Sequence, residues 1–333
     1  MSKTTRLLAL MMVMLMLVGA IASCANDSTV VLISPSDVEP PDIEEAYIDL
    51  AFEMVPLTES PAMFGTTEVP SAPGTLVKEN NKAVIDYSNT KDGYIMAKYK
   101  ANTSKELRVL VTGPSGTQYQ YTLKKNSTYE VYPLSDGSGK YSIGVYEQVD
   151  GSKYAVAVST QIDVKLTDEF APFLRPNQYV NFTPESKVVE KAAELIKDKE
   201  TLTDKIAAIY TFVVTNLTYD KELAQTVKSG YLPDVDAVIA KGKGICFDYA
   251  AVMAAMLRSQ GIPTRLVVGY AGQSYHAWID VYSETEGWIN NVIFFDGKEW
   301  KLMDPTFASS GGQSSAVMQY IGDGKNYTAK YLY

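Results

Sequence analysis

The chain has 333 residues, of which 46% are hydrophobic and 21% charged, and a formal net charge of −9. This composition is that of a globular protein, and the length is sufficient for two domains of ordinary size. Neither this charge nor the composition suggests a basic surface of the kind that binds nucleic acid.

The first 24 residues have the pattern of a secretory signal. Lys3 and Arg6 precede an uncharged apolar run over residues 7–21, and small residues then lead to Cys24. The run is short for a membrane-spanning helix but suits a signal segment. Small residues ending in Cys resemble a bacterial lipobox, in which the cysteine becomes the lipid-bearing N-terminus. We therefore predict an extracytoplasmic lipoprotein anchored to the cell membrane through Cys24, with a plain secretory signal and an incidental cysteine as the alternative.

Residues 25–79 are predicted to be a flexible acidic tether. They are rich in Pro, Ser and Thr, hold ten acidic residues between positions 25 and 77, and contain no Lys or Arg before Lys78. Such a composition cannot bury enough apolar surface to fold alone. The apolar stretch 46–55 is a candidate for pairing with the rest of the protein. Without the tether and the signal, the remaining body is close to neutral.

Residues 80–166 are predicted to form an immunoglobulin-like β-sandwich. Short runs rich in β-branched and aromatic residues alternate with turn signals such as Asp92-Gly93 and Asp150-Gly151. Even spacing of this kind is typical of antiparallel sandwiches. We expect a spacer or binding module without chemistry. The candidate strands are 83–85, 94–97, 107–111, 119–121, 129–131, 141–145 and 154–158.

Residues 167–333 form the second predicted domain, in which the period changes to helical. Thr183-Pro184 fits an N-cap followed by proline, and predicts a helix to about Lys199. A second helix is predicted from Thr203. Its apolar stripe is Ile206, Ile209, Tyr210, Val213 and Val214.

Cys246 is predicted to lie in the first turn of a buried helix. It follows Gly244-Ile245, and an Ala-, Met- and Leu-rich segment then runs to Gln260. Gly261 fits the residue after the C-cap, and Pro263 prevents continuation. At a helix start the dipole and the free backbone N–H groups stabilise a thiolate and could also receive an oxyanion.

His276, the single histidine, is predicted to lie on a strand that follows a strand over residues 264–270. Alternation places His276, Trp278 and Asp280 on one face. A third run, Trp300 to Asp304, ends at a proline. If the last two strands are neighbours, Asp304 can orient His276 towards Cys246 in a triad of nucleophile, base and orienter.

Three blocks of this region resemble the transglutaminase-like core in the same order. They are Gly244–Ala250 with Leu257–Arg265, then Tyr275–Trp278, then Trp300–Thr306, within a match of roughly residues 183–308. The resemblance implies a papain-like α+β fold, with the cysteine helix packed on an antiparallel sheet that bears His and Asp. It also implies thiol acyl transfer on an amide by Cys246, His276 and Asp304.

One element of the family pattern is missing. Animal transglutaminases place a Trp upstream of the cysteine as oxyanion donor, but all three Trp residues of this chain lie downstream. Tyr219 is a candidate substitute, with ordinary packing as its alternative. No calcium-loop pattern is present, and neither a metal nor a cofactor is predicted.

Each site residue also has a structural interpretation. Cys246 could be a small buried hydrophobe, His276 a structural strand residue, and Asp304 a turn cap. Trp278 is predicted to line the substrate pocket. Asp248 and Asp280 are predicted to be a helix-start group and a surface group.

Three functions remain open from the sequence. The favoured hypothesis is a membrane-tethered cysteine peptidase or amidase that acts on protein or cell-wall peptide, because water is abundant outside the cell. The second is a transamidase that forms isopeptide cross-links. The third is a non-catalytic binding or scaffold lipoprotein.

Overall fold

The N-terminal part of the computed structural model consists of two antiparallel sheets. The structure describes residues 29–31, 69–284, 287–289, 293–295, 300–302 and 327–333. One sheet has the order β2 (Val77–Glu79), β3 (Ala83–Asp86), β4 (Tyr94–Tyr99), β7 (Glu130–Pro133). The other has the order β1 (Thr29–Val31), β9 (Lys153–Val164), β8 (Gly139–Asp150), β5 (Leu107–Thr112), β6 (Gln118–Thr122).

All seven strands predicted between residues 80 and 166 are present. Their alternate side chains form one buried core between the two sheets, with Ile85 and Ile95 from one sheet and Val109 and Ile143 from the other. The strand order is a separate matter. In immunoglobulin constant domains the first, second and fifth strands share one sheet, and the third, sixth and seventh share the other. The seven predicted strands follow this division, with β3, β4 and β7 in one sheet and β5, β8 and β9 in the other. The fourth strand, β6, pairs with β5 instead of joining the first sheet, so the immunoglobulin-like identity of the sandwich stays a prediction.

Strand β1 lies within residues 25–79, which were predicted to be a tether. Thr29 to Val31 pair antiparallel with Lys153 to Ala155 of β9. Strand β2 likewise falls just before residue 80. The apolar stretch 46–55 lies outside the described residues.

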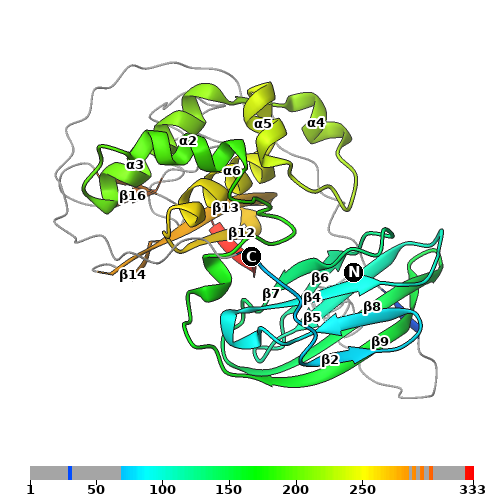
Figure 1. Cartoon of the computed structure of the whole chain (residues 1–333). Coiled ribbons are helices and arrows are strands. Elements are labelled where there is room, and N and C mark those ends of the chain that lie inside the picture. The colour runs from blue at the N-terminus through cyan, green and yellow to red at the C-terminus, as the bar shows by residue number, and fades with distance from the viewer. Residues whose placement is uncertain (1–28, 32–68, 285–286, 290–292, 296–299, 303–326) are drawn as a thin grey trace, which may run out of the picture.

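The C-terminal part has the predicted α+β composition (Figure 1). Its helices are α2 (Lys187–Ile196), α3 (Leu202–Asn216), α4 (Lys221–Thr226), α5 (Val235–Lys241) and α6 (Cys246–Ser259). The main sheet has the order β14 (Gly287–Ile289), β13 (Ser274–Ser283), β12 (Thr264–Ala271), β17 (Tyr327–Leu332). Two small pairs join β10 (Thr218–Tyr219) to β11 (Lys243–Gly244), and β15 (Ile293–Phe295) to β16 (Trp300–Leu302).

The start of the first helix differs from the prediction. Residues 183–186 form a turn, in which Ser186 N–H donates to the Thr183 carbonyl and Thr183 N–H donates to the Ser186 hydroxyl, both at 3.0 Å. Helix α2 begins at Lys187, where Asp236 of α5 accepts from the Lys187 and Val188 N–H groups. A carboxylate from a distant helix therefore satisfies the first turn, which no local pattern shows.

Helix α6 is the central element of this part. It packs against α2, α3 and α5 on one side and against β12 and β13 on the other. Every residue from Asp248 to Arg258 is buried, so the predicted buried helix is confirmed. Gly261 follows it with a φ of 75°, as the C-terminal prediction requires. No helix in the described part of the chain is both long and apolar enough to span a membrane.

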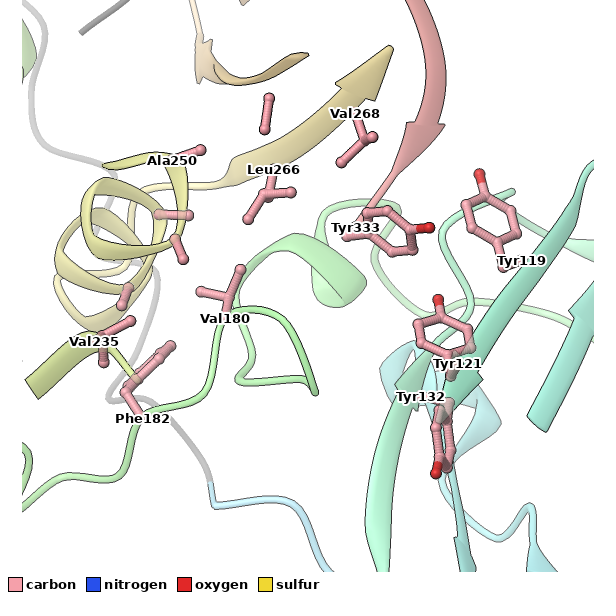
Figure 2. Close-up of a cluster of buried hydrophobic side chains, with 14 of the residues drawn as sticks. Tyr119, Tyr121, Tyr132, Val180, Phe182, Val235, Ala250, Leu266, Val268 and Tyr333 are labelled. Atoms are coloured by element: carbon pink, nitrogen blue, oxygen red, sulfur yellow. The ribbon is translucent and has the colours of Figure 1, made fainter. Parts of the chain in front are cut away.

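The two parts share a continuous hydrophobic core. Side chains of β5, β6 and β8, of the connecting segment around Val180, and of α6 belong to one cluster. Figure 2 shows the rings of Tyr119 and Tyr121 beside Tyr333, with Val180 nearer to α6. The sandwich is therefore packed onto the C-terminal part through side chains, in addition to the covalent connection.

Candidate active site

Cys246 is the first residue of α6 and is partly buried. Its approach is held by a short parallel ladder, in which Thr218 N–H donates to the Gly242 carbonyl at 2.9 Å and Asp220 N–H donates to the Gly244 carbonyl at 2.8 Å. The segment before the thiol is thus fixed to the end of α3. The predicted placement of Cys246 at a helix start is confirmed.

Asp248 closes the turn that carries Cys246. Its Oδ2 accepts from Ile245 N–H at 2.8 Å, and its own N–H donates to the Ile245 carbonyl at 2.9 Å. Gly244 leaves room for this carboxylate, because a Cβ at that position would lie 2.7 Å from Asp248 Cβ. The prediction of a helix-start group is confirmed, and the glycine explains why the turn can be so tight.

Tyr231 supports the site, although the sequence pattern did not indicate this role. Its hydroxyl donates to Asp248 Oδ1 at 2.7 Å. Asp248 is fully buried, and this burial raises the pKa of its carboxyl despite the two hydrogen bonds that oppose the shift. The aspartate three residues after a helix N-cap was a visible signal for the cap, but nothing local marks its tyrosine partner.

The chain path brings His276 to the same end of the fold as Cys246. Helix α6 leads through a short turn into β12, which therefore runs back along the helix towards its start. The β12–β13 hairpin turns between Ala271 and Ser274, so His276 follows shortly after that turn. The surroundings of Tyr275, the residue before His276, are consistent with this position. Burial raises the pKa of the Tyr275 hydroxyl, and charge interactions with nearby groups raise it further; Cys246 is one of these groups.

His276 is buried, with 8% of its surface exposed. It pairs across the ladder with Gly269, and its ring centroid lies 6.4 Å from those of Trp278 and Tyr327. Trp278 is 2% exposed and packs edge-on against Tyr327 at 5.1 Å. The histidine therefore lies among aromatic side chains, and the contact of Trp278 with substrate stays a prediction.

Tyr219 lies beside the approach to the thiol. It pairs in register with Gly244, two residues before Cys246, and its side chain is partly buried against the core. This position is compatible with a donor that reaches an oxyanion at the start of α6. Its role remains a prediction.

Two predicted site residues, Asp304 and Cys24, lie outside the described residues. The strand that leads to Asp304, β16, pairs with β15. In the described ranges the partners of β13 are β12 and β14. The strand adjacency on which the orienting role of Asp304 depends therefore remains a prediction.

Asp280 is not a surface group as predicted, because it is 5% exposed. It lies opposite Arg265 in the β12–β13 ladder. The Arg265 guanidinium lies 3.6 Å from the ring centre of Trp288 and 5.0 Å from that of Phe173. Alternation placed Asp280 on the face of His276 correctly, but it could not show that residues preceding α2 cover that face.

Within the described residues, no group of three or more His, Cys, Asp or Glu side chains could hold a metal ion. Cys246 offers a thiol at a helix start, and His276 offers an imidazole on the adjoining sheet. That combination is the one used in nucleophilic acyl transfer.

Comparison with known sequences gives a family match over the region that contains Cys246 and His276. The model of the transglutaminase-like superfamily matches residues 189–292. An uncharacterized protein, YebA, of Bacillus subtilis is 27% identical over 49% of this chain and 25% of its own length. A protein-glutamine gamma-glutamyltransferase of Pseudomonas aeruginosa is 34% identical over 14% of this chain and 9% of its own length. The alignments thus span a quarter or less of these curated relatives.

Similar solved structures are distant. A candidate cysteine protease from Cytophaga hutchinsonii is 19% identical, with a TM-score of 0.36, 70% of this chain and 72% of that chain covered. The periplasmic domain of TgpA from Pseudomonas aeruginosa is 17% identical, with a TM-score of 0.31 and coverage of 70% and 75%. Red sea bream transglutaminase is 15% identical, with a TM-score of 0.28 and coverage of 71% and 55%.

Proposed function

We propose, from the match of residues 189–292 to the model of the transglutaminase-like superfamily, that the protein is a thiol acyl-transfer enzyme that hydrolyses amide bonds in protein or cell-wall peptide. The observation that carries the proposal is the position of Cys246. It is the first residue of a buried helix, and the β12–β13 hairpin brings His276 to the same end. A helix start favours a thiolate, and a nearby imidazole can move the proton.

The reaction proceeds in two steps, acylation of the thiol and hydrolysis of the thioester. The Cys246 thiolate attacks the amide carbonyl, the C–N bond breaks, and protonated His276 gives its proton to the leaving amine. Water then attacks the thioester with His276 as general base, which releases the carboxylic acid and regenerates the thiol pair. Backbone N–H groups at the start of α6 receive the oxyanion, with the Tyr219 hydroxyl as the proposed additional donor. Asp304 is proposed to orient His276.

Transamidation is the second candidate, and one observation favours it. A relative that matches 14% of this chain is named a protein-glutamine gamma-glutamyltransferase. In that reaction an amine replaces water in the second step, and the same Cys246 and His276 serve both outcomes. The difference lies in which acceptor reaches the thioester.

A single incubation separates the two reactions. The full chain is mixed with a glutamine-containing peptide and a fluorescent primary amine, and the peptide is analysed by mass spectrometry. Hydrolysis gives a deamidated or shortened peptide without the fluorophore, whereas transamidation gives a peptide that carries the amine. The C246A variant is the control. If the wild-type chain modifies no member of a glutamine-peptide and cell-wall-peptide set beyond this control, a binding or scaffold function replaces the proposal.

The location of the enzyme is a further part of the proposal. The lipobox-like end of the signal segment supports lipid attachment at Cys24 and an extracytoplasmic position on the cell membrane. The C24S variant, expressed in a bacterial host, should move from the membrane fraction to the soluble fraction. Equal recovery of wild type and C24S in the membrane fraction would contradict lipid anchoring at this residue.

A further inference from the structure

The sandwich and the nucleophile helix are joined by the segment Asn177–Val180. The Gln178 side chain binds β6, since its Oε1 accepts from Thr122 N–H at 3.1 Å and its Nε2 donates to the Thr122 carbonyl at 2.8 Å. Asn177 holds the turn itself, because its Oδ1 accepts from the N–H groups of Tyr179 and Val180. Val180 is fully buried in the core that includes α6.

Tyr179 is the residue of this segment that touches both sides. Its hydroxyl donates to the Gln120 carbonyl of β6 at 3.1 Å, and its ring stacks on Tyr121 with centroids 5.5 Å apart. On the other side the same ring meets Phe247 at 5.3 Å. Phe247 is the residue directly after Cys246.

The surroundings keep this ring in place. Tyr179 also packs edge-on against Tyr333 at 4.6 Å, and Tyr333 in turn contacts Tyr119 and Tyr121. Backbone bonds between Tyr333 and Leu266 fix it to β12, at 2.8 and 2.9 Å. Aromatic pairs at such distances contribute beyond simple burial. The ring is therefore held by the sandwich and by the sheet.

We propose that the sandwich positions the nucleophile, with Tyr179 as the positioning residue that acts through Phe247 on Cys246. The inference rests on the proposed function, in which Cys246 is the reactive thiol. It revises the expectation that the sandwich is only a spacer or binding module. Phe247 lies in the first turn of α6 directly after Cys246, so the contact that holds its ring also constrains the turn that directs the thiol and the N–H groups, on which the first reaction step depends.

The test is the rate of Cys246 alkylation by iodoacetamide at pH 6 in the full chain, with peptide mapping to separate Cys246 from Cys24. Variants Y179L, F247L and the double variant are compared at a temperature at which circular dichroism shows each of them folded. Y179L is expected to slow alkylation about fivefold. The double variant should be no slower than the slower single variant, because both act through one contact. Y179F keeps the ring and should restore most of the rate.

The matched control is Y132L. Tyr132 is fully buried in the sandwich and contacts Tyr121 at 5.1 Å, one ring further from Phe247. Y132L should lower the melting temperature but leave the alkylation rate within about twofold of wild type. If Y132L slows alkylation as much as Y179L, or if Y179L reacts as fast as wild type, the positioning role is overturned.

Failure of the proposed function gives a different result. In that case wild-type Cys246 itself reacts no faster than glutathione. If Y179L does not fold, F247L tests the same ring pair from the helix side, and a wild-type rate in F247L overturns the inference.

Discussion

At the scale of single residues, the site consists of a reactive pair and a buried support for it. Cys246 and His276 supply the proposed chemistry, whereas Asp248 and Tyr231 fix the turn before the thiol. The two groups of residues should respond differently to substitution. Loss of the pair should remove turnover with little change in folding, while loss of the support should change stability first.

Replacing His276 tests the pair. H276A should reduce turnover of a peptide substrate by about 100-fold to 10,000-fold, the range that a general acid and base contributes. The free energy of unfolding, measured with urea, should change by far less than the activation free energy of the reaction. The outcome that would contradict the assignment is an H276A variant with wild-type turnover.

The buried carboxyl of Asp248 should make the free energy of unfolding depend on pH. Burial raises the pKa of its carboxyl above the ordinary value of 3.8. The stability that the protonated form contributes is therefore fully present below pH 3.8 and is lost as pH rises through the folded pKa. Asn cannot ionise, so wild type should lose stability relative to D248N over this window. Urea unfolding of both variants between pH 3 and pH 7 measures this difference, and a pH-independent difference would contradict the shift.

The sequence predicted some of these residues and missed others for physical reasons. Cys246 was predictable because a glycine-containing approach, an apolar helix and a glycine stop are all local signals. Asp280 was assigned to the surface because strand alternation shows which residues share a face but not what covers it. Tyr231 lies in a loop 17 residues before Asp248, and only the folded chain brings the two together.

At the scale of elements, the turn from β11 into α6 is fixed from two sides. Gly244 lies between the ladder to β10 and the Asp248 side chain. The elements themselves were largely predictable, since period-2 runs gave the seven sandwich strands. Strand β10 was not predicted, because its two residues are too few for a periodic pattern.

Adding one methyl group to this turn tests its tightness. G244A would place a Cβ 2.7 Å from Asp248 Cβ, so the carboxylate or the turn must move. We expect destabilisation of about 1–3 kcal/mol, as for overpacking of a core, together with slower alkylation of Cys246. The two readouts are urea unfolding and the iodoacetamide rate. Wild-type values for both would show that the turn has space that the structure does not indicate.

At the scale of the whole molecule, the sandwich and the C-terminal part behave as one packed unit. A single hydrophobic cluster crosses from one to the other, and the segment around Tyr179 binds both. The domains were predictable because the spacing of apolar residues changes from that of strands to that of helices along the chain. This spacing could not show their contact, because that contact depends on tyrosines of β6 meeting residues more than 50 positions away.

Cooperative unfolding follows from this shared core. All three Trp residues lie between residues 278 and 300, so tryptophan fluorescence reports the C-terminal part, whereas far-ultraviolet circular dichroism reports both parts. We expect the two urea transitions to coincide in midpoint. Two separate midpoints would show that the sandwich and the C-terminal part unfold independently.

The central claim is that Cys246 is an activated nucleophile, and its alkylation rate tests this most directly. An ordinary cysteine thiol has a pKa of about 8.5 and is almost entirely protonated at pH 6. Wild-type Cys246, identified by peptide mapping, should react with iodoacetamide at pH 6 faster than glutathione does, and H276A should lower this rate. A wild-type rate at or below that of glutathione would contradict the account.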